Sequence, residues 1–207
     1  VVKTVFLESG TWSDYQVMPW LEQRLSAKGF TAAPSVVAAL AEQVGTDLSR
    51  LHNEVNKLHV AMGDARSLSA ADIERHIGIS KDYNNFELVA AIATRDVAKA
   101  FKIVHFFSKN AKEHPVQMIT GILFNFVNNL IQYHSLKGKN EKQIATALKV
   151  HPYFLKQFSA AARYYSAEHA HIMLEELLVF DRKCKGVIRS SSGEYEHLRE
   201  WLIRCAL

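Results

Sequence analysis

Glycine, proline and cysteine are all scarce in this chain, which contains 9, 4 and 2 of them among its 207 residues. So few turn-forming residues argue against a loop-rich all-β fold. Two cysteines cannot build a disulfide framework, which favours a reducing, cytoplasmic setting. No apolar run approaches the roughly 18 residues that a membrane span requires, and the first residues do not resemble a signal peptide. These scarcities predict a soluble, cytoplasmic, mostly helical protein with no membrane partner.

Charge is distributed unevenly along the chain. Residues 1–78 contain 7 Lys+Arg and 9 Asp+Glu, a net charge of −2, whereas residues 79–207 contain 18 and 12, a net charge of +6. This difference favours two structural units, with a mild positive potential on the second. A net charge of +6 over this length is a weak signal for nucleic-acid binding, and a solvated helical surface is the plainer interpretation.

The first residues carry the one convincing strand signal. Residues 1–7 are rich in β-branched side chains and are followed by Ser9-Gly10. A lone strand has no partner within the chain. We therefore expect it to be the remnant of a sheet whose other strands are missing.

Helical periodicity runs from Thr11 to Gly78. Four short helices are predicted, and their starts are indicated by Pro19 in a first turn, by Pro34, by Asp47 and by a Ser69-x-x-Asp72 capping box. The predicted inward positions are Leu21, Leu25, Val36, Val37, Leu40, Val44, Leu48, Leu51, Val55, Leu58, Met62, Ile73 and Ile77. These helices predict a compact module of about 65 residues.

Residues 79–207 predict longer helices with short connections, as in a helical bundle. Helix starts are indicated by Asp96, Pro115, Asn140, Pro152 and Ser166. Three pairs of adjacent aromatic residues lie in this half, and the members of a pair diverge by about 100° on a helix. The pairs are Phe106-Phe107, Tyr153-Phe154 and Tyr164-Tyr165. Some of these rings should lie in contacts between subunits, unless a second helix layer covers them.

No motif for catalysis, cofactor binding or metal binding is present. The sequence has no GxxxxGK[ST], GxGxxG or GxSxG. The closest approach to a metal pattern is His169, His171 and Glu175, which lacks a third ligand on one helix face. Cys184 and Cys205 each follow a helical apolar pattern, which indicates structural thiols. We therefore predict no catalytic residue, no cofactor and no metal.

Two basic clusters remain. One comprises Lys137, Lys139 and Lys142; the other comprises Arg182, Lys183, Lys185 and Arg189, at the end of a predicted helix and in the loop after it. Cations at a helix C-terminus also interact favourably with the helix dipole. Capping or simple solvation thus competes with phosphate contact for both clusters, and the second cluster is the candidate nucleic-acid site.

Several segments resemble a known family. They are Leu40 to Leu58 with its glycine stop, Tyr83-Asn84-Asn85-Phe86-Glu87-Leu88, Asp96-Val97-Ala98-Lys99-Ala100, Lys142-Gln143-Ile144-Ala145 and Leu148-x-x-His151-Pro152-Tyr153. In order and spacing they resemble the delta subunit of the bacterial DNA polymerase III clamp loader, over about residues 11–207. Each segment alone is an ordinary amphipathic helix with a stop.

The resemblance implies an all-α fold with three parts. Residues 1–10 would be a remnant of an N-terminal AAA+-like domain, 11–78 a small helical lid domain, and 79–207 a helical-bundle collar. It also implies a non-enzymatic subunit that helps to load the sliding clamp onto primed DNA. The collar would bind other clamp-loader subunits, and primed DNA would be bound weakly or only in the complex. The sliding clamp would be contacted through the missing N-terminal domain.

Two other functions stay open. A free-standing helical nucleic-acid-binding module would use the positively charged half and would bind DNA in a strongly salt-dependent way. A small helical enzyme would require a metal or a pocket with a base, for which the sequence offers no pattern.

Overall fold

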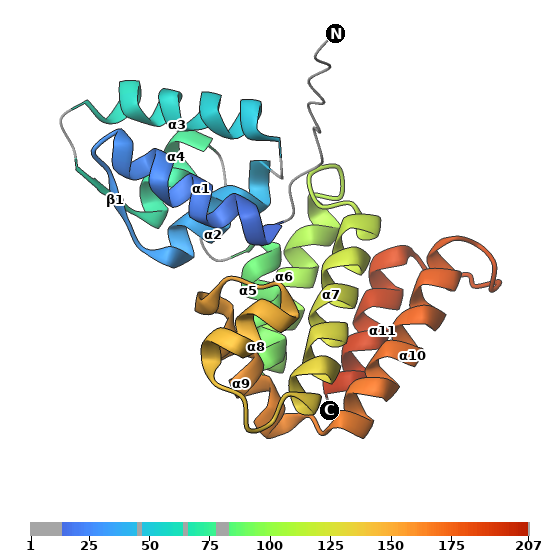
Figure 1. Cartoon of the computed structure of the whole chain (residues 1–207). Helices are drawn as coiled ribbons and strands as arrows, with labels where there is room; N and C mark the ends of the chain where they lie inside the picture. Colours follow the sequence, from blue (N-terminus) through green and yellow to red (C-terminus); the bar gives the residue numbers. More distant parts are fainter. Residues whose placement is uncertain (1–13, 45–46, 64–65, 78–82, 207) are drawn as a thin grey trace, which may run out of the picture. The chain divides into compact units, whose positions relative to one another are not determined.

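A computed structural model describes residues 14–44, 47–63, 66–77 and 83–206. These residues form eleven α-helices, one 3-10 turn and two strands of two residues each, so the predicted all-α fold is confirmed. They divide between residues 79 and 80 into two compact units (Figure 1). The assignment of the units as lid and collar stays a prediction. The predicted strand over residues 1–7 lies outside the described residues.

The N-terminal unit consists of four helices and a minimal sheet. Its elements are α1 (Asp14–Ala27), β1 (Thr31–Ala32), α2 (Pro34–Val44), α3 (Leu48–Met62), β2 (Ser67–Leu68) and α4 (Ala70–Ile77). The Asp47 carboxylate accepts hydrogen bonds from two backbone N–H groups of α3, and Asp72 accepts from both the N–H and the hydroxyl of Ser69. Both predicted caps are therefore confirmed. Leu40 and Leu51 are fully buried in the core between these helices.

One prediction for this unit is wrong, and one feature of it was not predicted. Pro19 lies inside α1, which begins at Asp14, five residues earlier, so Pro19 is not in the first turn. The helix tolerates the lost backbone hydrogen bond because its apolar face is buried, as Val17 and Leu21 indicate. The parallel pair of β1 with β2, which matches Thr31 with Ser67, was also missed. Two residues are too few to display a strand period.

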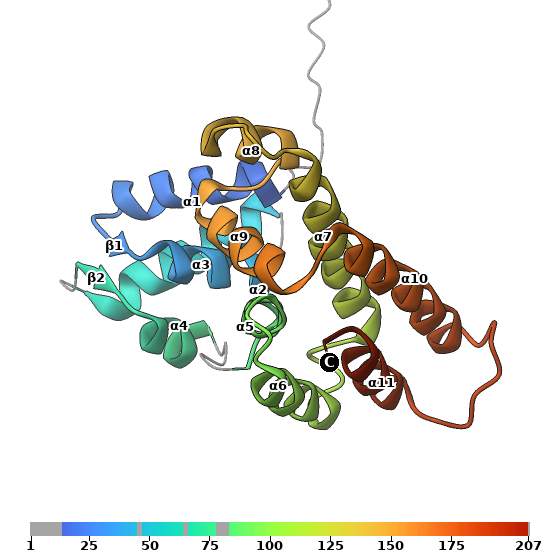
Figure 2. The same cartoon turned by 90° about the horizontal axis from the view of Figure 1, so that it is seen from below.

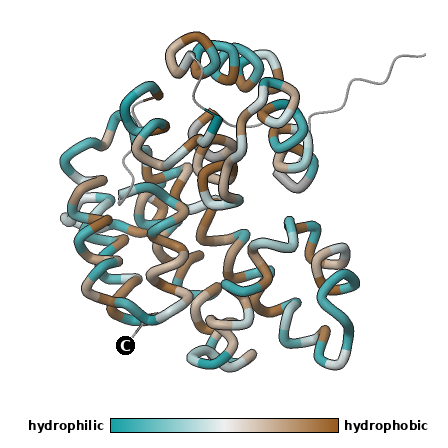
Figure 3. Tube along the Cα trace, turned by 90° about the vertical axis from the view of Figure 1, so that its left-hand side faces the viewer, coloured by the Kyte–Doolittle hydropathy of each residue, from teal (hydrophilic) through white to brown (hydrophobic). Residues whose placement is uncertain are grey.

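The C-terminal unit is a helical bundle. Its elements are α5 (Asn85–Ala93), α6 (Val97–Lys109), α7 (Val116–Ser135), α8 (Glu141–Leu148), η1 (Pro152–Phe154), α9 (Leu155–Tyr164), α10 (Ala167–Cys184) and α11 (Glu194–Ala206). Helix α10 packs between α7 and α11, and α5 packs against α6 and α9 (Figure 2). The predicted caps Asp96, Asn140 and Ser166 each accept a hydrogen bond from the helix that follows. Apolar residues recur along one side of these helices (Figure 3) and form one continuous core.

Buried polar groups fix the packing of distant helices in this bundle. The Tyr165 hydroxyl donates to the carbonyl of Ile92 at 2.8 Å, and Nε1 of Trp201 donates to the carbonyl of Met173 at 3.2 Å. Burial raises the pKa of Tyr165 to about 12. These two hydrogen bonds connect the start of α10 to α5, and α11 to α10.

The two cysteines are free thiols in apolar surroundings. Cys205 is buried and Cys184 is half-buried. Burial raises the pKa of Cys205 to about 12 and that of Cys184 to about 11. Both thiols therefore stay protonated at neutral pH, as expected of structural cysteines.

The adjacent aromatic residues are divided between core and surface. Phe107 and Tyr165 are buried, whereas Tyr164 is 50% exposed. Phe106 is half-buried and stacks on Tyr83, with ring centroids 4.9 Å apart. Helices of the bundle thus cover most of these rings.

Among the described helices, none combines the length and the apolar character needed to cross a bilayer.

Candidate nucleic-acid interface

The predicted basic cluster lies at the C-terminal end of α10 and in the loop that leads to α11. Arg182 and Lys183 are in the last turn of α10, and the backbone N–H of Lys185 caps the helix by donating to the Asp181 carbonyl. Arg189 lies in the loop after Gly186, whose φ of +71° suits a glycine. The structure therefore brings the four cations to one end of one helix.

Ion pairs within the bundle occupy two of the four cations. Nζ of Lys183 lies 2.7 Å from a carboxylate oxygen of Glu200 on α11. Nζ of Lys185 lies 2.7 Å from the Asp181 carboxylate, four residues before it. Arg182 and Arg189 are exposed. The capping and pairing roles thus account for Lys183 and Lys185, and the two arginines remain the stronger candidates for phosphate contact.

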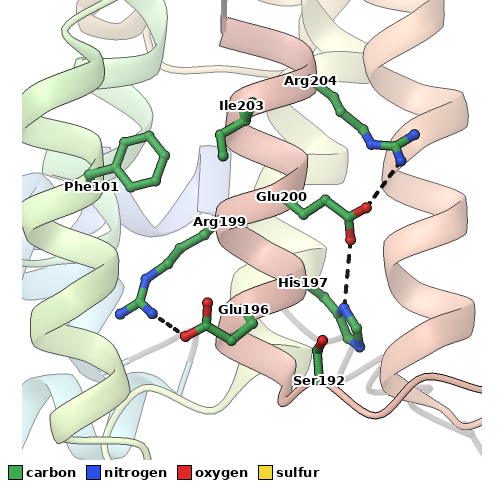
Figure 4. Close-up of a pocket in the computed structure, with 8 residues that line it drawn as sticks. All are labelled: Phe101, Ser192, Glu196, His197, Arg199, Glu200, Ile203 and Arg204. Atoms are coloured by element: carbon green, nitrogen blue, oxygen red, sulfur yellow. Dashed lines mark hydrogen bonds and ion pairs between the residues drawn. The ribbon is translucent and has the colours of Figure 1, made fainter.

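Glu200 is at the centre of a charged network between α10 and α11. Besides Lys183, it accepts a hydrogen bond from Arg204 at 3.0 Å, and Nδ1 of buried His197 lies 3.8 Å from it (Figure 4). Arg204 also reaches Glu176 on α10, at 3.2 Å. The hydrogen bond from Lys183, followed by the positive charges of Lys183 and Arg204, lowers the pKa of Glu200. This network joins α10 to α11 at the surface of the bundle.

A cavity of about 540 Å³ lies beside this network. Its lining consists of Phe101, Ser192, Glu196, His197, Arg199, Glu200, Ile203 and Arg204 (Figure 4). Arg199 is paired with Glu196, so both arginines of the lining face carboxylates. A phosphate bound here would have to compete with these carboxylates for the guanidinium groups. The cavity is therefore a poor site for an anion.

The histidine pattern on α10 has a structural explanation. Nε2 of His169 donates to the carbonyl of Cys205 at 2.8 Å and so ties α10 to the end of α11. Within the described part of the chain, no group of three or more His, Cys, Asp or Glu side chains converges as metal ligands would.

Sequence reasoning missed Glu176, Glu200 and Arg204. The spacing of Glu200 and Arg204, four residues apart on one helix, is a signal that was available. The contact between Lys183 and Glu200 joins two helices and has no local signal. Only the packing of α10 on α11 brings these residues together.

We expect Glu200→Gln to remove part of the acid sensitivity of the C-terminal unit. Because the pKa of Glu200 is lowered in the folded state, its stabilisation is complete above its ordinary value of 4.5 and is lost as the pH falls through the folded value. The effect should stay below about 1 kcal/mol, because the side chain is 38% exposed and solvent screens the pairs. Urea unfolding at pH 7 and pH 3 measures it.

A matched control for this measurement is Glu175→Gln, at an exposed glutamate on the neighbouring helix. The Glu200→Gln variant should be less stable than the unaltered chain at pH 7, and the difference should shrink as the pH falls from 7 to 3. A difference of the same size at both pH values would exclude the charge of Glu200 as its cause.

Comparisons with known proteins agree with this fold. The family model for the DNA polymerase III delta subunit, C-terminal domain, matches residues 82–202. DNA polymerase III subunit delta of Bacillus subtilis (strain 168) is 31% identical over 144 residues, which are 69% of this chain and 41% of that protein. The solved Bacillus subtilis DNA clamp loader delta protein has the same fold, with a TM-score of 0.64 and 24% identity, over 97% of this chain and 58% of that one.

This chain therefore spans less than two thirds of the length of both relatives. The family match covers more than half of the chain and lies within the C-terminal bundle. The chain belongs to the family of DNA polymerase III delta subunits.

Proposed function

We propose that this chain is a non-catalytic part of a clamp loader that helps to load the sliding clamp onto primed DNA. Residues 79–207 act as a collar that binds other loader subunits, and residues 11–78 act as a lid. The family match over residues 82–202 is the observation that carries this proposal, because it covers the proposed collar. The likeness to the Bacillus subtilis clamp loader delta protein supports it at the level of the fold.

Exposed apolar side chains on the collar support a role in assembly. Phe124 on α7 is 48% exposed, and Ile172 and Leu178 on α10 are each 52% exposed. These two helices pack directly against each other. Large apolar side chains on the outside of a bundle are typical of residues that a partner subunit covers.

We expect the triple variant Phe124→Ser, Ile172→Ser, Leu178→Ser to lose affinity for the other loader subunits. Central apolar residues of an interface commonly contribute enough for a loss of roughly tenfold or more. Because all three side chains are half-exposed, the melting temperature of the isolated chain should change little. Copurification with the other loader subunits and thermal unfolding measure the two effects.

The control is Val60→Ser, at an apolar side chain on α3 of the N-terminal unit that is 82% exposed. It should leave copurification intact. If the triple variant assembles as well as the unaltered chain, the outer faces of α7 and α10 are not the collar contact.

The basic cluster at the end of α10 is proposed to contact phosphate in the assembled loader. Each phosphate contact adds about 0.9 to the slope of log affinity against log salt. Since Lys183 and Lys185 are ion-paired, most of the effect should come from Arg182 and Arg189.

We therefore expect Arg182→Ala with Arg189→Ala to reduce this slope by roughly two, and Lys183→Ala with Lys185→Ala to reduce it much less. Binding of primed DNA by the reconstituted loader, measured at two or more salt concentrations, provides both slopes. An unchanged slope in the arginine variant would contradict phosphate contact. The cations would then only interact with the C-terminal end of α10.

A further inference from the structure

Helix α7 is the longest helix of the C-terminal unit, and none of its 20 residues is Asp, Glu, Lys or Arg. At the chain's average of 22% charged residues, a helix of this length would contain about four. Every other α-helix of the described chain contains at least one charged residue. A helix without charge is expected where all of its sides are covered.

One side of α7 is nevertheless open. Helices α5, α8, α9 and α10 pack on its other sides. The open side over residues 117–132 is about 22 Å long, and its spacing of three or four residues makes one continuous stripe. We call this stripe the α7 face; its exposed residues are Gln117, Met118, Gly121, Phe124, Asn125 and Gln132.

The composition of the α7 face is that of an interface core. It combines Met118 and Phe124 with uncharged amide side chains. The cores of protein interfaces are depleted of charged residues and enriched in aromatic residues and methionine, whereas an ordinary solvated helix face is charged. The α7 face therefore has the chemistry of a surface that another protein covers.

Gly121 lies at the centre of the α7 face, between Met118 and Phe124. Its backbone is helical, and a Cβ at this position would meet no neighbouring atom within 4 Å. Neither the packing nor the backbone conformation of this chain thus requires glycine, which destabilises a helix relative to alanine. A partner that approaches α7 closely at this point would require it.

An uncharged helix fits the α7 face. The side chains of Gln117, Met118, Phe124 and Asn125 surround Gly121 at a spacing of three or four residues, which is the arrangement of a hole that receives one large side chain of a facing helix. A charged side chain buried against α7 would lose its hydration without an opposite charge on this helix. Glu194 of α11 accepts a hydrogen bond from Gln117 at 3.4 Å, at one end of the stripe.

A second copy of this chain is a poorer partner than a different subunit. Residues 79–207 have a net charge of +6, so two such units repel each other. A partner without a large positive charge does not meet this repulsion.

We propose that the α7 face binds an α-helix of another clamp-loader subunit, whose facing side is uncharged and places one large apolar side chain over Gly121. Met118 and Phe124 pack against this side chain, and Asn125 and Gln132 form hydrogen bonds with uncharged polar groups beside it. This contact, which rests on the clamp-loader role proposed above, gives the collar one specific helix for assembly and defines the chemistry of the helix that it binds.

The test titrates the full chain with the other clamp-loader subunits and compares Gly121→Ala with Gly121→Leu. Alanine and leucine are better helix formers than glycine, so neither variant should melt at a lower temperature than the unaltered chain. Affinity should fall from glycine to alanine to leucine, by at least about tenfold for leucine, because its side chain occupies the place of the partner's side chain. The control Ala147→Leu adds the same side chain at an exposed position of α8 and should bind normally.

A pair of charge variants tests the chemistry of the partner. Asn125→Lys and Asn125→Glu should both weaken binding, because either charge would be buried against an uncharged helix. If one of them weakens binding and the other strengthens it, the partner's facing side is charged and the proposal is wrong.

Three other results would also contradict the proposal. If the unaltered chain binds the other subunits and Gly121→Leu binds them equally well, the α7 face is not the contact and the clamp-loader role stands. If the unaltered chain binds none of them, the clamp-loader role and this contact are both wrong. Sedimentation of the chain alone should show a monomer; a dimer that Gly121→Leu abolishes would identify a second copy as the partner instead.

Discussion

Replacement of Trp201 by alanine is expected to lower the free energy of unfolding of the C-terminal unit by about 3–5 kcal/mol. The indole is 2% exposed, lies at the interface of α11 and α10, and donates to the Met173 carbonyl. Its loss creates a cavity and leaves that carbonyl without the hydrogen bond from the indole. Denaturant unfolding followed by circular dichroism measures the change, since the variant lacks the fluorophore of this unit.

The control for this variant is Phe124→Ala, at a large aromatic side chain that is 48% exposed. Phe124→Ala should lower the free energy of unfolding much less than Trp201→Ala does, because Phe124 buries less apolar surface. A loss of less than about 1 kcal/mol for Trp201→Ala would mean that α10 and α11 are not held together by this indole.

Leu51→Ala is expected to lower the free energy of unfolding of the N-terminal unit by about 2–5 kcal/mol and to leave that of the C-terminal unit unchanged. Leu51 is fully buried on α3, whereas Val60 on the same helix is 82% exposed and provides the control as Val60→Ala. Because the described residues divide into two units with separate cores, the two substitutions should each shift a different unfolding transition.

Tryptophan fluorescence can distinguish these transitions, since Trp20 lies on α1 and Trp201 lies on α11. Leu51→Ala should move the transition of the first unit and leave that of the second in place. If Leu51→Ala and Trp201→Ala both shift one common transition, residues 11–78 and 79–207 do not act as separate lid and collar domains.

Local signals predicted the helices well. The caps at Asp47, Asp96, Asn140 and Ser166 require only a short polar side chain beside its own helix, so the sequence contains all the information. The β1–β2 pair joins residues about 36 positions apart through two residues on each strand. No local pattern encodes such a contact, and it was missed.

The candidate sites could be predicted only in part. The sequence identified the cations at the end of α10, but the partner of Lys183 lies on another helix and is set by packing. The left-handed residue that ends α8, Lys149, was also missed, because glycine is the usual signal for such a position. Its left-handed conformation becomes visible only in the fold.

The high pKa values of the two cysteines have a practical consequence for chemical labelling. Burial raises the pKa of Cys184 to about 11 and that of Cys205 to about 12, so very little of either thiol is ionised at pH 8. Maleimide reagents attack the thiolate, so Cys184 and Cys205 should react slowly in the folded protein. A cysteine introduced at an exposed position such as Arg163 would therefore take up a fluorophore selectively, without prior removal of the native thiols.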